Sequence, residues 1–300
     1  MAAPLFRVPV RLLGLAALLL SLTCARAQNL SSPPPAVTPA KIPQLIIVGD
    51  STANSSGAVQ GWGTPFAKYF DPAKIQVLNR ARGGRSSKTF ILEGLWDNVV
   101  SELQPGDIVL IQFGQNDGSL LNDTKARGSL PGLGDETKDV TLPNGEKQTV
   151  HTFGWYMRKY IADTLAKGAR PIVLTLTVRD IWQRNTGKVE HGPGNYSLWS
   201  TEVAKAQNVP LIDLTSLIAA DYEKMGPKQV KTLFGPDTTH TNPAGAEINA
   251  SFVVAGLKAL PDHPVDAYLS PKGKIVPAAP ASAVVVPGAH PDAKPSTSKK

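Results

Sequence analysis

The 300-residue sequence has one cysteine, no internal repeat and no apolar run long enough to cross a bilayer. The single Cys24 excludes an intramolecular disulfide framework and any cysteine-rich zinc or iron–sulfur site. The absence of GxGxxG and Walker A patterns removes support for nucleotide binding, and the histidines lack the HExxH spacing of a metal site. Neither a disulfide-stapled protein, a solenoid nor a common nucleotide-binding enzyme is therefore expected.

The first 27 residues have the pattern of a secretory signal peptide. Arg7 and Arg11 form a basic start, Leu12–Leu22 is mostly apolar, and Ala25-Arg26-Ala27 supplies a small-x-small cleavage site. Eleven apolar residues are too few for a membrane span, which needs roughly 20. We expect cleavage after Ala27, export to the periplasm or the medium, and no stable membrane anchor; an uncleaved anchor is the alternative.

The formal net charge of +7 is concentrated at the two ends of the chain. Three positive charges lie in the signal region and a net +2 lies in residues 261–300, which leaves +2 for residues 28–260. A body so close to neutral offers no electrostatic footprint for nucleic acid. No nucleic-acid partner is therefore expected.

Composition also divides the chain into segments. Residues 28–43 hold five prolines and predict a linker, while residues 263–300 are rich in proline, alanine and lysine and predict a disordered tail. Pairing of Ala283–Val286 with a sheet edge is the alternative within that tail. Residues 44–262 are expected to form the folded domain.

Within residues 44–262, short apolar runs alternate with helical patterns. This alternation predicts one parallel sheet with helices on both faces, an α/β/α arrangement. Asn242 and Pro243 have the residue types of an N-cap and a first helical position. The expected strands are 45–48, 75–78, 108–113, 171–178 and 210–212, and the expected helices are 62–69, 152–167, 214–225 and 243–260.

Two long stretches, residues 118–150 and 180–196, interrupt this alternation. Long loops in a compact domain are commonly functional or disordered. In open parallel sheets the ligand crevice lies beyond the carboxyl ends of the strands, so the residues that follow each strand are the candidates for a site.

Polar blocks follow the first three strands, and a fourth precedes the last helix. Each block alone is weak evidence, but four in this order favour a reaction centre. They are Gly49-Asp50-Ser51-Thr52, Arg82-Gly83-Gly84-Arg85-Ser86, Gly114-Gln115-Asn116-Asp117 and Asp237-Thr238-Thr239-His240-Thr241-Asn242.

These blocks contain the groups that acyl transfer needs. The hydroxyl of Ser51 becomes a nucleophile when a base takes its proton, and His240 can be that base with Asp237 orienting its ring. The oxyanion formed by the attack needs fixed donors, which the backbone N–H groups of Ser51 and Gly84 and the side-chain amide of Asn116 can supply. Asp50 and Asp117 are expected to have structural roles.

The four blocks resemble those of the SGNH/GDSL hydrolase superfamily, and most closely those of rhamnogalacturonan acetylesterases. Gly61-Trp62-Gly63, Lys88-Thr89-Phe90 and Pro243-Ala244-Gly245-Ala246 extend the similarity, which spans residues 44 to about 260. The resemblance implies a single three-layer, flavodoxin-like α/β/α domain that needs no metal or cofactor. It also implies Ser51, Asp237 and His240 as the triad, with Ser51, Gly84 and Asn116 as the oxyanion hole.

The sequence departs from these esterases directly before the oxyanion asparagine. Gln115 stands where they often have histidine, which leaves the detailed substrate preference open. The serine block also lacks the G-x-S-x-G elbow, which argues against an ordinary α/β-hydrolase.

Three further residues are candidates for sugar binding. Arg179 can pair with a uronate carboxylate and Trp182 can stack on a sugar face, although a lid that packs against the body is the alternative for both. Arg85 can contact an acidic sugar or anchor the loop of Gly84.

The sequence thus predicts an exported, monomeric serine esterase that removes O-acetyl groups from a plant cell-wall polysaccharide, with pectic rhamnogalacturonan as the first candidate. The alternatives are a lipid esterase or lysophospholipase of the same superfamily, and a non-catalytic carbohydrate-binding protein on the same scaffold.

Overall fold

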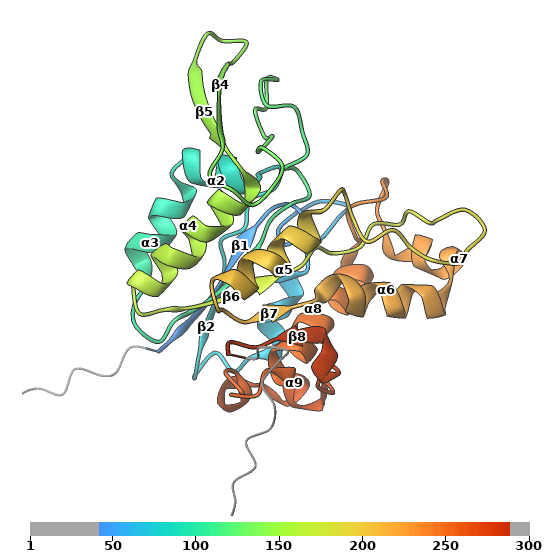
Figure 1. Cartoon of the computed structure of the whole chain (residues 1–300). Helices are drawn as coiled ribbons and strands as arrows, with labels where there is room; N and C mark the ends of the chain where they lie inside the picture. Colours follow the sequence, from blue (N-terminus) through green and yellow to red (C-terminus); the bar gives the residue numbers. More distant parts are fainter. Residues whose placement is uncertain (1–41, 289–300) are drawn as a thin grey trace, which may run out of the picture. The chain divides into compact units, whose positions relative to one another are not determined.

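A computed structural model describes residues 42–288 of the chain, and its centre is a parallel β-sheet (Figure 1). The strand order is β2-β1-β3-β6-β7-β8, in which all pairs are parallel except β7 with β8. This order confirms the predicted parallel sheet. The strands are β1 (Gln44–Gly49), β2 (Gln76–Asn79), β3 (Ile108–Gln112), β6 (Arg170–Leu174), β7 (Leu211–Ile212) and β8 (Val284–Val285).

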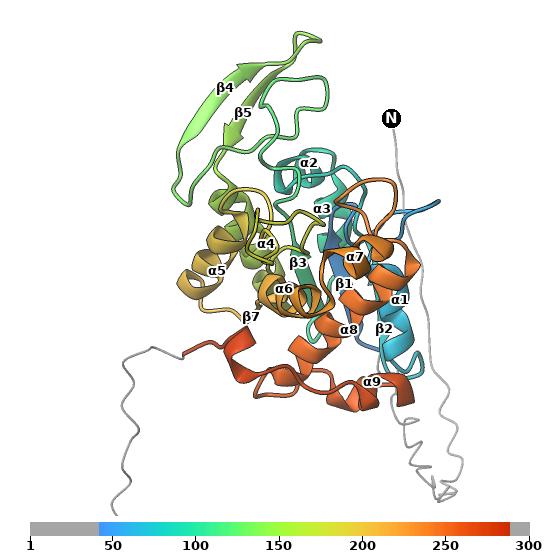
Figure 2. The ribbon, with the colours of Figure 1, turned by 90° about the vertical axis from the view of Figure 1, so that its right-hand side faces the viewer.

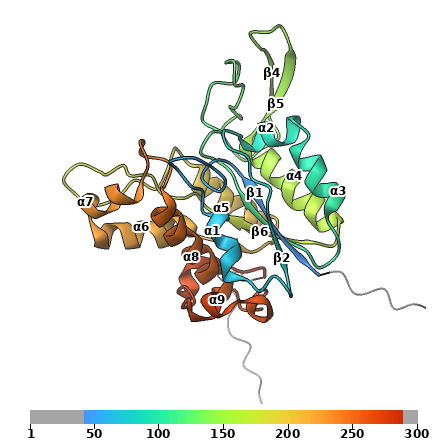
Figure 3. The same ribbon diagram turned by 180° about the vertical axis from the view of Figure 1, so that it is seen from behind.

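Helices cover both faces of the sheet (Figures 1 and 3). They are α1 (Gly63–Phe66), α2 (Ser87–Leu92), α3 (Leu95–Glu102), α4 (Phe153–Ala166), α5 (Tyr196–Ala206), α6 (Leu214–Met225), α7 (Pro227–Val230), α8 (Pro243–Ala259) and α9 (Pro271–Ile275). Four 3₁₀ turns, η1 (Ala67–Tyr69), η2 (Lys231–Leu233), η3 (Asp266–Tyr268) and η4 (Ala281–Ala283), link some of them.

Alternate residues of each strand belong to two separate hydrophobic cores. Leu45 and Ile47 of β1 pack with residues of α1, α6 and α8, whereas Ile46 and Val48 pack with residues of α2, α3, α4 and α5. Because successive strand side chains point to opposite faces, a strand buried on both sides reads as a continuous apolar run. The sequence and the structure therefore agree on the three-layer α/β/α class.

The helix boundaries show which local signals were readable in the sequence. Helix α8 begins at Pro243 after the N-cap Asn242, as predicted, and α4 begins after Thr152, whose hydroxyl accepts from the Trp155 N–H. Helices α2 and α3 were not predicted, since they have only 6 and 8 residues. Helix α5 was missed because it begins at the end of a stretch assigned to a loop.

The first long stretch, residues 118–150, contains an antiparallel hairpin. Strand β4 (Thr137–Thr141) pairs with β5 (Lys147–His151), and the pair projects beyond α2 and α4 (Figures 1 and 2). The second stretch, residues 180–196, is irregular and closes on itself through a bridge between Trp182 and Val189.

The prediction of a disordered tail from residue 263 onward is wrong for residues 263–288. Val265 and Leu269 are buried in the same core as α8, and β8 pairs with β7 along the sheet edge. The Glu247 carboxylate of α8 accepts from the Tyr69 hydroxyl at 2.6 Å and from the Lys272 ammonium. A few apolar residues spaced among prolines are enough to dock this segment on the core. The average composition of residues 263–300 does not reveal these residues.

Strand β1 begins at Gln44, where the predicted linker ends. The predicted signal peptide, linker residues 28–41 and residues 289–300 lie outside the described part of the chain. Between residues 42 and 288 no helix combines the length and the apolar character that a membrane span requires.

Candidate active site

The site lies at the carboxyl ends of the central strands, and Ser51 occupies the turn that follows β1. The N–H groups of Ala53 and Asn54 donate to the carbonyl of Asp50 at 3.3 and 3.1 Å, which closes this turn. Gly61 packs directly on it, since a Cβ at Gly61 would lie 2.3 Å from the Ala53 carbonyl carbon. The nucleophile candidate therefore sits on a tightly packed turn.

His240 reaches Ser51 from the loop that precedes α8. Its Nε2 lies 2.8 Å from the Ser51 Oγ, and its Nδ1 lies 2.8 Å from Asp237 Oδ2. The other carboxylate oxygen of Asp237, Oδ1, accepts the N–H groups of Thr239 and His240, each at 2.8 Å. The loop thus wraps around one carboxylate, which holds the imidazole between Asp237 and Ser51.

Hydrogen bonding sets the charge state of Asp237. Partial burial raises the pKa of this carboxyl, but hydrogen bonds from the His240 ring and from the backbone of His240 and Thr239 outweigh that effect and lower the pKa below its usual value. An ionised Asp237 favours the tautomer with the proton on His240 Nδ1, which leaves Nε2 free to accept the Ser51 proton.

The three blocks that carry the expected oxyanion donors adjoin one another at this edge of the sheet. A Cβ at Gly83 would lie 3.7 Å from the Ser51 Cβ, and the Asn116 Nδ2 donates to the Arg85 carbonyl at 2.9 Å, so the blocks after β1, β2 and β3 adjoin one another. Among residues 42–288, neither the Ser51 N–H nor the Gly84 N–H has a hydrogen-bond acceptor. Gly84 has φ +77°, a conformation that glycine adopts without a Cβ penalty.

Two buried aspartates support these loops. Asp50 accepts the N–H and hydroxyl of Thr52, both at 2.8 Å, and its burial raises its pKa despite these bonds. Asp117 accepts the N–H of Ser87 at 3.1 Å and also its hydroxyl, and burial raises the pKa of Asp117 to about 7. Asp117 therefore ties the block after β3 to the start of α2.

The three sugar-binding candidates already have partners within the protein. Arg85 pairs with Glu93 at 2.8 Å and also donates to the Gly83 carbonyl, which anchors the Gly84 loop. The Trp182 Nε1 donates to Asp180 at 2.8 Å, and the half-buried ring packs on the core. Their roles in sugar binding stay predictions.

Arg179 is held by Gln115, the residue at which the sequence departs from related esterases. The Arg179 Nε donates to Gln115 Oε1 at 2.8 Å and its Nη2 donates to the Gln115 carbonyl at 3.2 Å. Burial lowers the pKa of Arg179, while the neighbouring carboxylates of Asp50 and Asp237 raise it. Gln115 thus places a cation beside the acidic member of the candidate triad.

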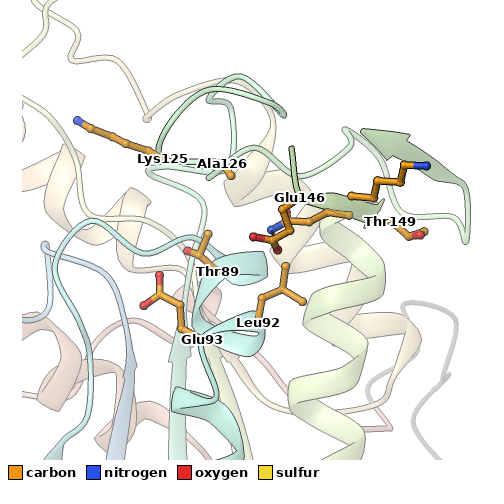
Figure 4. A pocket seen from close by; sticks show the side chains of 9 residues that line it. Thr89, Leu92, Glu93, Lys125, Ala126, Glu146 and Thr149 are labelled. Carbon is orange, nitrogen blue, oxygen red and sulfur yellow. Dashed lines mark hydrogen bonds between the residues drawn. The ribbon is translucent and has the colours of Figure 1, made fainter. Parts of the chain in front are cut away.

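Two neighbouring hollows along α2, together called the trough, share part of their lining, and the first of them adjoins the candidate oxyanion hole at Gly84. The first, of about 400 Å³, is lined by Gly84, Arg85, Thr89, Glu93, Thr124, Lys125 and Arg127. It shares Thr89, Glu93 and Lys125 with a second hollow of about 520 Å³ that ends at the hairpin residues 146–149 (Figure 4). Polar and charged side chains dominate both.

Arg127 is a residue of the site that sequence reasoning missed. It lies in the first long stretch, and its Nη1 donates to the Asn116 Oδ1 at 2.8 Å. No spacing relative to the four blocks marks it.

In residues 42–288 no group of three or more His, Cys, Asp or Glu side chains is arranged to hold a metal ion.

Comparison with known proteins identifies the family of the chain. Residues 47–248 match the GDSL-like Lipase/Acylhydrolase family. The chain is 33% identical over 213 residues to a rhamnogalacturonan acetylesterase of Emericella nidulans, covering 71% of this chain and 84% of the relative. It is 29% identical over 249 residues to the rhamnogalacturonan acetylesterase RhgT of Bacillus subtilis, covering 77% and 96%.

Among solved structures, the chain is similar to the crystal structure of the Bacillus subtilis protein YxiM. The TM-score is 0.57 at 26% identity, with 72% of this chain and 56% of that protein covered. These matches confirm the resemblance inferred from the four blocks. The chain belongs to the GDSL-like lipase/acylhydrolase family of the SGNH hydrolase superfamily.

Proposed function

We propose that this protein is an exported serine esterase that removes O-acetyl groups from a plant cell-wall polysaccharide, with pectic rhamnogalacturonan as its first candidate substrate. The observation that carries the proposal is the hydrogen-bonded chain Ser51–His240–Asp237, with distances of 2.8 Å at both links. The N–H groups of Ser51 and Gly84 lie in adjoining blocks and have no acceptor within residues 42–288. The 33% identity to a rhamnogalacturonan acetylesterase supports the choice of substrate.

The proposed reaction has two halves that use the same groups. The Ser51 Oγ attacks the acetyl carbonyl while His240 Nε2 takes its proton, and the N–H groups of Ser51 and Gly84 and the Asn116 amide stabilise the oxyanion. When the tetrahedral intermediate collapses, the bond between the acetyl carbon and the sugar oxygen breaks, His240 protonates that oxygen so that it leaves as a hydroxyl, and an acetyl ester remains on Ser51. A water molecule deprotonated by His240 then attacks this ester, releases acetate and restores Ser51.

The openness of the site suits a polymer. About half of the Asp237 side chain (49%) and about a quarter of the His240 side chain (28%) remain accessible to solvent. A sugar unit within a long chain can approach such a surface site, because neither end of the polymer has to thread into a cavity.

The trough along α2 favours a sugar over a long acyl chain as its occupant. Of its lining side chains only Leu92 and Ala126 are aliphatic, and the others carry hydroxyl, amide, carboxylate, ammonium or guanidinium groups (Figure 4). Burying these groups under an acyl chain would strip their hydration without replacing it. This favours a carbohydrate esterase over a lipid esterase or lysophospholipase.

The test is an acetate-release screen with purified protein over acetylated rhamnogalacturonan, homogalacturonan, xylan and mannan. We expect the highest kcat/KM on rhamnogalacturonan, and the same enzyme should prefer p-nitrophenyl acetate to the octanoate. A preference for octanoate would favour the lipid esterase, and acetate release from xylan alone would overturn the choice of polysaccharide.

A second experiment distinguishes an active serine esterase from a non-catalytic protein that only binds carbohydrate. A fluorophosphonate probe reacts with an activated serine, so we expect it to label the wild type at Ser51 and to leave Ser51→Ala unlabelled. Absence of labelling in the wild type would favour a non-catalytic carbohydrate-binding protein.

Export and the monomeric state are proposed from the sequence. Fractionation followed by N-terminal sequencing should find the protein outside the cytoplasm with Gln28 as its first residue, and light scattering should give the mass of one chain. Retention of Met1 in a membrane fraction would overturn the export proposal.

A further inference from the structure

The side-chain amide of Asn116 is held at both of its ends. Its Oδ1 accepts from the Arg127 Nη1 at 2.8 Å, and its Nδ2 donates to the Arg85 carbonyl at 2.9 Å. Because a guanidinium group can only donate, the oxygen of the amide must face Arg127 and the nitrogen must face the Gly84 loop. The second N–H of Nδ2 has no acceptor within residues 42–288, so it is available to the proposed oxyanion.

The loop around Arg127 is constrained on both sides of this residue. Asp123 Oδ1 accepts the N–H groups of Lys125 at 3.0 Å and Ala126 at 2.6 Å, and Ala126 has φ +46°. On the other side, the Gly128 N–H donates to the Leu120 carbonyl at 3.2 Å. A non-glycine residue in the left-handed region costs on the order of 1–3 kcal/mol and persists only where its surroundings impose it.

The position of Arg127 is not explained by an ion pair. Within residues 42–288 no carboxylate pairs with it, and its buried Nε has no hydrogen-bond partner. Buried donors without partners are rare, since each loses its hydration without compensation. Within the same residues, the hydrogen bond from Nη1 to the Asn116 Oδ1 is the only one that the Arg127 side chain makes.

We propose that Arg127 is a positioning residue, which fixes the Asn116 amide so that Nδ2 faces the oxyanion. A charge-assisted bond to Oδ1 opposes rotation of the amide and polarises it, which makes the free N–H a better donor. The long stretch that the sequence left without a role would thus deliver this arginine to the site. The inference rests on the proposed role of Asn116 in the esterase reaction.

The test is a double-mutant cycle on kcat with p-nitrophenyl acetate, a substrate too small to depend on the trough. Loss of one oxyanion donor costs on the order of 10²–10³ in kcat. We expect Arg127→Met to lower kcat by about 10- to 100-fold with KM changed less than about threefold, because misplacing a catalytic group by about 1 Å has effects of this size. In the Asn116→Ala background, Arg127→Met should change kcat by less than about threefold, since a residue that acts through Asn116 has nothing left to position.

Arg158→Met is the matched control. The Arg158 Nη2 donates to the Gly134 carbonyl at 3.0 Å, so this guanidinium also tethers the stretch 118–150 but does not contact the site. We expect its kcat to stay within about twofold of the wild type. If Arg158→Met lowers kcat as much as Arg127→Met, loosening of the loop is the cause and the positioning role is overturned.

The remaining outcomes separate this inference from the proposed function. Multiplicative losses in the double mutant, or a wild-type kcat in Arg127→Met, would overturn the role of Arg127 and leave the esterase proposal standing. A wild-type kcat in Asn116→Ala would refute the proposed oxyanion hole and the role of Arg127 together. Should Arg127→Met fail to fold, Arg127→Lys enters the same cycle and must show the same non-additivity.

Discussion

Replacing Asp237 by asparagine exchanges one carboxylate oxygen for an NH₂ group and tests how the tautomer of His240 is controlled. The two oxygens of Asp237 have different partners: Oδ1 accepts two backbone N–H groups at 2.8 Å each, and Oδ2 faces the His240 Nδ1 at 2.8 Å. The amide of an asparagine has one oxygen and one nitrogen, so only one of these positions can keep an acceptor.

The surroundings determine which way the amide of Asp237→Asn will turn. Placing its nitrogen at the Oδ1 position would lose both backbone hydrogen bonds, each worth about 0.5–1.5 kcal/mol. The amide NH₂ would then face two backbone N–H groups, which are also donors. A difference of about 1–3 kcal/mol corresponds to a preference of about 5- to 150-fold for the orientation with oxygen on the backbone. The amide nitrogen then faces His240 Nδ1.

This orientation selects the wrong tautomer of the imidazole. A donating amide at Nδ1 places the ring proton on Nε2, which then cannot accept the proton of Ser51. An imidazole in the wrong tautomer costs on the order of 10⁴ in kcat, or about 5.5 kcal/mol. We expect Asp237→Asn to lower kcat for p-nitrophenyl acetate by about 10³- to 10⁴-fold while the melting temperature changes little.

The chain contains a matched control for this substitution. Asp266 lies 3.2 Å from the Nδ1 of His263, also three residues away, at the surface. Asp266→Asn should keep the wild-type kcat, because this pair does not adjoin Ser51. An Asp237→Asn enzyme within about tenfold of the wild type would refute the reasoning, since His240 would then not depend on Asp237 for its tautomer.

Three further predictions concern stability. Gly84→Ala should lower the free energy of unfolding in urea by about 1–2 kcal/mol, because the φ of Gly84 is +77°, although a Cβ there would meet nothing within 4 Å. Gly83→Ala should lower the free energy of unfolding by less, and equal losses in the two variants would contradict this. Burial raises the pKa of Asp117 to about 7, so folding takes up a proton between about pH 4 and 7 and stability falls as the pH rises through this window. The drop in melting temperature from pH 5 to 8 should be smaller in Asp117→Asn, and an equal drop would count against the raised pKa. Leu269→Ala should cost about 2–5 kcal/mol by urea unfolding because Leu269 is 4% exposed, and an unchanged stability would mean that the segment is not docked.

The blocks of the site could be predicted because parallel strands bring their carboxyl ends to one edge of the sheet. Ser51, Gly84 and Asn116 follow three strands that were each predicted from their apolar residues. The predicted positions of the strands therefore also gave the positions of these three residues. The hydrogen bonds that link the blocks, such as Ser51 to His240 and Asn116 to the Arg85 carbonyl, depend on turn geometry. The sequence expresses this geometry only through glycines such as Gly84 and through the spacing of Asp237 and His240.

Other features depend on tertiary contacts that have no local signal. Arg127 meets Asn116 because of the path that residues 118–130 take. The hairpin of β4 and β5 has mostly exposed, polar strands and therefore lacks the alternation that marks a half-buried strand. In the segment after residue 263, Val265 and Leu269 are too isolated to form a pattern, yet both find a place in the core.

The central claim is that Ser51 is the nucleophile of a polysaccharide acetylesterase. The most direct measurement is acetate released from acetylated rhamnogalacturonan by the purified wild type and by Ser51→Ala, after both have been shown to share one melting temperature. We expect continuous release by the wild type and a loss on the order of 10⁵–10⁶ in rate for the variant, because the nucleophile acts as a unit with its base. Equal rates for the two proteins would contradict it.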